Sequence, residues 1–140
     1  MLRPGFFKSA LALAVFIILA FSLGVAQNRN SGPKYDKSQE AKIKGVVDEV
    51  RVLPEGGAVL VVNTGGDNSI LVRLAPDAFL KEMEVSFEKG QSVEIIGAKL
   101  ANAPAPEMLA REVTANNNTV VLRDNAGTPV WVGWNPSKHD

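Results

Sequence analysis

Residues 69–80, SILVRLAPDAFL, contain the change of pattern that decides the fold of this chain. The residues before the proline alternate as a half-buried strand does, which places Arg73 on the outer face of the strand. Pro76 cannot donate a hydrogen bond to a strand ladder, so the strand ends there. Because most of the remaining sequence has the pattern of strands and turns, whatever follows Pro76 restricts which β architecture is possible.

The segment after Pro76 has the composition of a short helix. Good helix formers follow the proline, and Phe79, Leu80 and Met83 lie on one side of the helix they predict. The turn residues 88–91 leave room for only one or two helical turns. We therefore expect a short helix at 77–83 whose apolar side chains belong to the core.

Strand patterns surround this helix on both sides. The expected strands are 43–52, 58–64, 69–74, 92–100 and 108–115, followed by a terminal hairpin of 119–123 with 129–134. Gly45 interrupts the first of these patterns and predicts a bulge or sharp bend, and Gly97 in the fourth predicts a bend or a close backbone approach. Three meandering strands, a short helix and two more strands follow the order of the OB-fold, a five-stranded, partly open Greek-key barrel. An open β-sandwich is the alternative.

The first residues have the pattern of an export signal. Arg3 and Lys8 precede an apolar run at 9–25, and small residues at 24–26 predict cleavage after Ala26. The alternative is an uncleaved membrane anchor at 9–26. A polar linker is expected at 27–40, the barrel domain with its hairpin at 41–134, and a polar tail at 135–140. The exported part is expected in the periplasm or cell envelope, and it contacts the membrane only if the anchor is retained.

Charge and cysteine content exclude several kinds of function. Without Arg3 and Lys8, thirteen basic side chains remain against fifteen acidic ones, a formal net charge of −2. The basic surface typical of nucleic-acid binding is therefore absent. The chain has no cysteine, which excludes disulfides, thiolate zinc sites, thiol catalysis and covalent c-type haem attachment.

The sequence offers no catalytic, cofactor or metal site, and we expect no enzyme activity. The single histidine, His139, lies in the polar tail, and adjacent strand carboxylates such as Asp48 and Glu49 point to opposite faces. The face of the second and third strands, where OB-folds bind oligonucleotides or oligosaccharides, carries Asn63, Asn68 and Arg73 but no aromatic side chain for stacking.

The best candidates for an interaction surface lie on the outer strands and near the C-terminus. Trp131 and Trp134 would face opposite sides of a strand, so one indole is expected in the core and the other, Trp134, at the surface as an interface anchor. Arg73, Arg111 and Arg123 are candidates for a small basic patch that suits a partner carboxylate. Solvated strand arginines are the alternative interpretation.

The order of several short motifs resembles that of a known family. The motifs are Leu74-Ala75-Pro76, Phe79-Leu80, Lys89-Gly90, Gly97-Ala98, AREV at 110–113, LRD at 122–124, Gly127 and PVW at 129–131. Over residues 41–131 the chain is similar to exported bacterial OB-like domains related to the MamS/MamX-type domain of magnetosome-associated proteins. The resemblance implies an envelope-located, non-enzymatic domain, in some relatives joined to haem-binding Cys-x-x-Cys-His segments. Without cysteine, the electron-transfer role of those relatives cannot be carried over.

These observations lead to one functional expectation and two alternatives. We expect an exported, non-enzymatic binding or scaffolding module of the cell envelope that contacts another envelope protein. The alternatives are an OB domain that binds oligonucleotides or oligosaccharides, and an accessory of an envelope electron-transfer system without its own haem.

Overall fold

The computed structural model describes residues 33–135. The expected signal segment, its cleavage position and the tail beyond residue 135 lie outside the described residues. The compact unit that contains the strands begins at Tyr35, earlier than the expected boundary at residue 41. Residues 35–40, expected as the end of a flexible linker, instead contain a short 3₁₀ helix, η1 (Lys37–Gln39), and the first residue of the first strand. Asp36 caps η1 by accepting a hydrogen bond from the Ser38 amide at 3.0 Å.

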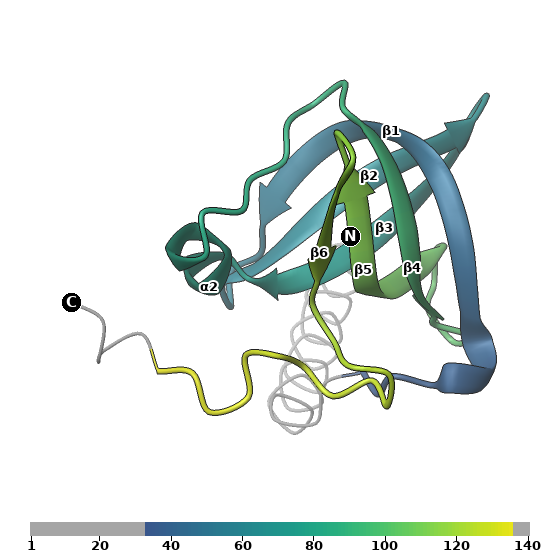
Figure 1. Ribbon diagram of the computed structural model, residues 1–140. Coiled ribbons are helices and arrows are strands. Elements are labelled where there is room, and N and C mark those ends of the chain that lie inside the picture. Colours follow the sequence, from purple (N-terminus) through teal and green to yellow (C-terminus); the bar gives the residue numbers. More distant parts are fainter. Residues whose placement is uncertain (1–32, 136–140) are drawn as a thin grey trace, which may run out of the picture. The chain divides into compact units, whose positions relative to one another are not determined.

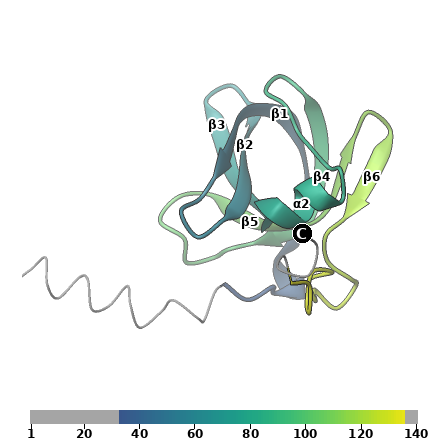
Figure 2. The ribbon, with the colours of Figure 1, turned by 90° about the vertical axis from the view of Figure 1, so that its left-hand side faces the viewer.

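Six strands and one short α-helix follow in the order that the sequence predicts for a barrel. They are β1 (Glu40–Val52), β2 (Gly57–Gly65), β3 (Asn68–Pro76), α2 (Asp77–Glu82), β4 (Ser92–Lys99), β5 (Glu107–Ala115) and β6 (Asn118–Val121). The strand order is β3-β2-β1-β4-β5-β6, and a parallel pair between β3 and β5 closes five of the strands into a barrel. The OB-like fold class is therefore confirmed; Figure 1 labels the six strands, and Figure 2 shows β6 standing apart from the closed ring.

The long strand β1 serves both halves of the barrel. Its first half, from Glu40 to Val46, pairs with β4, and its second half, from Val46 to Val52, pairs with β2. A β-carbon on Gly45 would lie 2.3 Å from the Asn63 carbonyl oxygen, so the backbones of β1 and β2 approach closely at this glycine. The register shift itself falls slightly later, between Val47 and Glu49. The bulge lets one strand curl between two neighbours.

The interior of the barrel holds the predicted core. Ile70, Val72 and Leu74 of β3 are buried, and Arg73 faces outward, as the alternation predicts. Phe79 and Leu80 of α2 are also buried, and Figure 2 shows α2 lying across one end of the barrel. Met83 was expected beside them, which is wrong: its side chain is 59% exposed. The helix ends at Glu82, and Glu84 has a φ of 59°, so the chain turns away before Met83 can pack.

The C-terminal hairpin has different partners from those expected. Strand β6 pairs with β5 across a turn at Asn116 and Asn117, both of which have positive φ. Residues 129–134 contribute only one bridge, between Pro129 and Arg123, and continue in turns. The physical reason is local: proline lacks the amide that a ladder needs, and Gly133 has a φ of 80°. None of the helices in the described part of the chain is long and apolar enough to span a bilayer.

Candidate functional site

The segment after β6 carries three of the five predicted interaction residues. We call residues 123–134 the strap; it leaves β6 and runs toward the end of the barrel that α2 covers (Figure 1). Trp131 and Trp134 lie near its end, joined by a turn in which the Trp134 amide donates to the Trp131 carbonyl at 2.9 Å. The strap is therefore a turn-rich segment against the barrel rather than a strand.

Both indoles pack on the same side chain of α2. The ring centroid of Phe79 lies 6.1 Å from that of Trp131 and 5.5 Å from that of Trp134, the latter in an edge-to-face arrangement. The indole Nε1 of Trp134 also donates to Glu82 Oε2 at 2.6 Å. The expectation that the two indoles face opposite sides is wrong, because the turn brings them to one side. Both are half-buried, and the greater exposure expected for Trp134 stays a prediction.

Between and beside the two indoles the strap displays aliphatic side chains. Val132 is 68% exposed and Val130 is 47% exposed, although both flank the anchored Trp131. Met83, which follows Glu82 directly, is exposed as well. The aromatic residues thus hold the strap to the domain, while its valines face solvent.

Arg111 joins the first strand to the fifth. Its guanidinium makes a bidentate pair with Glu40, with Nε to Oε2 at 3.0 Å and Nη2 to Oε1 at 3.1 Å. Nη1 donates to Glu112 at 2.6 Å and to Asn125 of the strap at 3.2 Å. Tyr35 donates its hydroxyl to the same Glu40 carboxylate at 2.5 Å. This network ties the entry to the barrel and the strap to one side chain of β5.

Arg123 lies between two aromatic rings. Its Cζ is 5.5 Å from the centroid of the Tyr35 ring and 5.4 Å from that of Trp131, both within cation–π range. Nη1 donates to the Gly127 carbonyl at 2.9 Å, whereas the buried Nε has no hydrogen-bond partner within residues 33–135. A β-carbon on Gly127 would lie 2.5 Å from the Tyr35 ring, so only glycine permits this packing. We call Tyr35, Arg123 and Trp131 the clasp.

The three predicted arginines do not form one patch of unpaired positive charge. Arg73 forms an ion pair with Glu107 at the start of β5, and Arg111 is engaged by two carboxylates. Arg123 has no carboxylate partner among the described residues, but the two rings of the clasp cover it. Only Arg111 and Arg123 are brought together, through their shared neighbour Tyr35.

The local environment shifts the pKa values of several groups in this cluster. Burial, followed by the hydrogen bond to Glu40, raises the pKa of the Tyr35 phenol to about 12. The hydrogen bonds from Arg111 and Tyr35 lower the pKa of Glu40, in that order of size. Burial lowers the pKa of Arg123. Near neutral pH, the cluster therefore contains a neutral phenol, a carboxylate and guanidinium groups held in fixed contacts.

Sequence reasoning missed Tyr35, Glu40 and Phe79 as members of this site. Glu40 and Arg111 are 71 positions apart, and Tyr35 lay in a segment with the composition of a linker. Gly127 was noted as part of a motif, but nothing in the sequence indicates that its missing side chain makes room for a tyrosine ring. In the described part of the chain, no three His, Asp or Glu side chains are grouped so that they could hold a metal ion.

The topology and the clasp define a small OB-like barrel domain with an ordered C-terminal strap. The chain belongs to the MamS/MamX magnetosome protein family, whose model matches residues 39–120. The match ends within β6, so the LRD, Gly127 and PVW motifs that contributed to the resemblance lie beyond it. The strap is therefore a feature of this chain outside the matched region.

Three solved structures match parts of this chain, each with a TM-score below 0.5. One is the S. pombe Stn1–Ten1 complex, with 18% identity over 56% of this chain and 59% of that chain and a TM-score of 0.47. Two others are OBody NL8 and OBody AM3L09, each bound to hen egg-white lysozyme. They have 22% and 17% identity, cover 56% and 62% of this chain and 94% and 99% of theirs, and both have a TM-score of 0.44. A search of the curated proteins finds no match.

Proposed function

We propose that this protein is an exported, non-enzymatic binding or scaffolding module of the cell envelope that acts through contact with another envelope protein. The observation that carries the proposal is the strap, which holds two exposed valines on a backbone anchored by two indoles. Exposed aliphatic side chains grouped on a fixed segment are typical of protein-binding surfaces.

The anchoring of the strap favours binding on entropic grounds. Trp131 and Trp134 already pack on Phe79, and Asp124 accepts hydrogen bonds from the Ala126 and Thr128 amides, each at 2.9 Å. A segment that is ordered before it meets a partner loses less conformational freedom on binding. The valines at 130 and 132 would then contribute apolar contact area at a low ordering cost.

The chemistry of the cluster supports a binding role over catalysis. A general acid or base works best when its pKa lies near the operating pH, whereas the pKa of Tyr35 is raised to about 12 and that of Glu40 is lowered. Each of these groups is also engaged by another side chain of the domain. Such groups hold a structure together rather than transfer protons.

The envelope location rests on the N-terminal pattern and on the family. Arg3, Lys8 and the apolar run at 9–25 have the order of an export signal. The family description names magnetosome proteins, which agrees with a role at a membrane system. Mass spectrometry of the mature chain tests this part: a first residue of Gln27 supports export and cleavage, whereas an intact Met1 contradicts cleavage.

The binding role is tested by affinity capture from an envelope extract. The tagged wild-type chain is compared with a V130S/V132S variant and with a matched control, V46S, which alters an exposed valine on β1. We expect the same partner with wild type and V46S and its loss with V130S/V132S, while thermal melts show all three folded. Equal recovery by all three proteins would contradict the proposal.

A further inference from the structure

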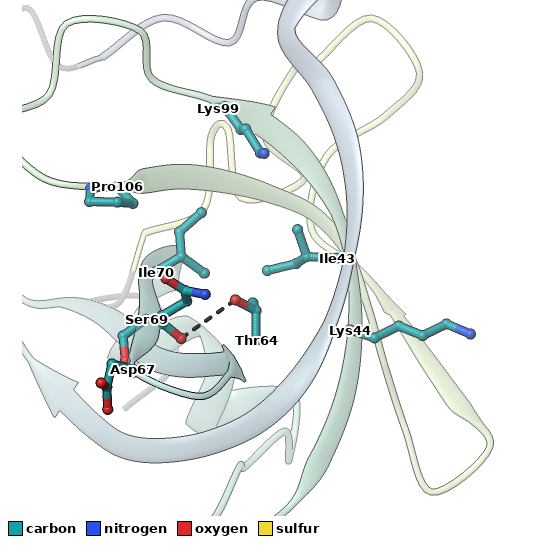
Figure 3. Close-up of a pocket in the computed structure, with 9 residues that line it drawn as sticks. Ile43, Lys44, Thr64, Asp67, Ser69, Ile70, Lys99 and Pro106 are labelled. Atoms are coloured by element: carbon teal, nitrogen blue, oxygen red, sulfur yellow. Dashed lines mark hydrogen bonds between the residues drawn. The ribbon is translucent and has the colours of Figure 1, made fainter.

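The end of the barrel opposite α2 contains a hollow of about 510 Å³. Figure 3 shows Ile43 of β1 and Ile70 of β3 facing this space from two sides. Pro106, just before β5, and Lys99, at the end of β4, complete the ring of strands around it. The volume lies in the range of small-molecule sites, which is about 300–1,000 Å³. The remaining lining residues are Lys44, Thr64, Asp67, Asn68 and Ser69.

The walls of this hollow are fixed by hydrogen bonds. At the turn between β2 and β3, the Asn63 side chain accepts from the Gly65 amide at 2.8 Å and donates to the Gly66 carbonyl at 3.1 Å. Where β3 meets the segment before β5, the Leu71 amide donates to the Pro106 carbonyl at 3.0 Å. A ligand would therefore enter a site that is formed in advance, which lowers the cost of binding.

Two lysines line the hollow, but only the side chain of Lys99 points into it. Figure 3 shows the Lys99 side chain reaching into the space toward Ile43, while Lys44 points away from it. Lys44 is 3.5 Å from Glu94, whereas Lys99 has no ion pair within residues 33–135. Asp67, the one carboxylate of the lining, lies at the hairpin turn and makes no ion pair with Lys99. The hollow thus combines an apolar floor with one available ammonium group.

We propose that this hollow binds a short aliphatic carboxylate. The hydrocarbon part lies against Ile43, Ile70 and Pro106, and the carboxylate pairs with the Lys99 ammonium. A single cation beside an apolar floor matches a molecule with one negative charge and one hydrocarbon chain. The lining contains no aromatic side chain on which a nucleobase would stack. This site is distinct from the strap, and its occupancy does not depend on the proposed protein contact.

The test uses the full chain and hexanoate as the probe. Isothermal titration calorimetry measures its affinity for wild type, for K99Q and for the matched control K44Q, which removes the lysine that points away. We expect K99Q to weaken hexanoate binding about tenfold and K44Q to leave it within about twofold, because a hydrogen-bonded charge pair is lost only in the first. Amide chemical shifts should change at Ile43, Ile70 and Lys99.

Results of four kinds would overturn this proposal. One is the absence of measurable binding at millimolar hexanoate. Another is equal affinity of wild type and K99Q, or of hexanoate and 1-hexanol, because the ammonium would then have no role. A third is a set of shifts confined to the strap. The fourth is tighter binding of a short peptide with a free apolar C-terminus than of hexanoate, which would make a polypeptide the occupant.

Discussion

The two ends of the barrel are built from the same strands but finished in opposite ways. At one end, α2 places Phe79 and Leu80 in the core, and the indoles of the strap cover Phe79 from outside. At the other end, Ile43 and Ile70 face a hollow whose lining includes no residue of α2. The difference comes from the connections, because β3 continues into a helix whereas β2 turns back through two glycines.

The comparison indicates that the closed end of the barrel contributes mainly to stability and the open end mainly to ligand binding. Apolar area removed from water at the closed end contributes to the free energy of unfolding, whereas apolar area left open at the other end is available to a ligand. Substitutions at the closed end should therefore change stability most, and substitutions at the open end should change ligand affinity with little effect on stability.

The largest effect is expected from F79A at the closed end. Phe79 fills the barrel end and supports both indoles, so its truncation should lower the free energy of unfolding by about 3–5 kcal/mol. Chemical denaturation followed by tryptophan fluorescence measures this change. M83A, on the exposed residue after the same helix, is the control and should change stability by less than about 0.5 kcal/mol. Equal effects of the two variants would show that Phe79 does not close the barrel.

A smaller loss is expected from G97A on β4. A β-carbon there would lie 2.2 Å from the Leu109 carbonyl oxygen of β5, where the β4–β5 register shifts. The backbone must move to relieve this contact, which should cost about 1–3 kcal/mol. G57A is the control, since its β-carbon would meet only the flexible Glu55 side chain at 3.2 Å. Chemical denaturation measures both variants. An unchanged free energy of unfolding in G97A would mean that the strands near the open end can move to accommodate the β-carbon.

How far the sequence predicted the fold follows from the kind of signal each element carries. The alternation in β3, the proline before α2 and the bend glycines report local preferences, and these elements formed where expected. Trp131 and Trp134 were misplaced because strand alternation was assumed for residues that form turns. Met83 was misplaced because the end of a two-turn helix depends on the residues after it.

The site was less predictable than the fold, because its contacts join distant parts of the chain. Arg111 and Arg123 were identified as candidates, but their partners Glu40 and Tyr35 precede or begin the first strand. Side chains so far apart in sequence meet only after the barrel has closed. Residue types and their spacing along the sequence therefore do not predict these contacts.

A moderate effect is expected from R123A, which removes the centre of the clasp. The guanidinium lies between the rings of Tyr35 and Trp131, and partly desolvated cation–π contacts are worth about 1–2 kcal/mol. We expect a loss of that size in denaturation, with a red shift of tryptophan emission as Trp131 becomes more exposed. R51A is the control, because Arg51 is exposed and pairs only with Glu49. An unchanged emission spectrum in R123A would show that the strap stays in place without the clasp.

The smallest effect at neutral pH is expected at Tyr35, whose phenol titrates only in alkali. The folded chain raises its pKa from 10.0 to about 12, so the folded state favours the protonated phenol. Its contribution to stability is fully present below pH 10 and is lost as the pH rises toward 12, because the unfolded chain releases the proton first. Tyr35 is the only tyrosine of the sequence, so tyrosinate absorbance reports it directly.

Y35F separates this titration from that of the lysines, which ionise in the same range. The difference in unfolding free energy between wild type and Y35F should be constant below pH 10 and should change steadily between pH 10 and 12. Removing the Glu40 carboxylate in E40Q should move the phenol midpoint downward, since the hydrogen bond to Glu40 and its negative charge both raise the pKa of the phenol. A phenol titration midpoint near pH 10 in the wild type would mean that the Tyr35 ring is solvated. The packing of the strap would then include Trp131 but not Tyr35, which precedes β1.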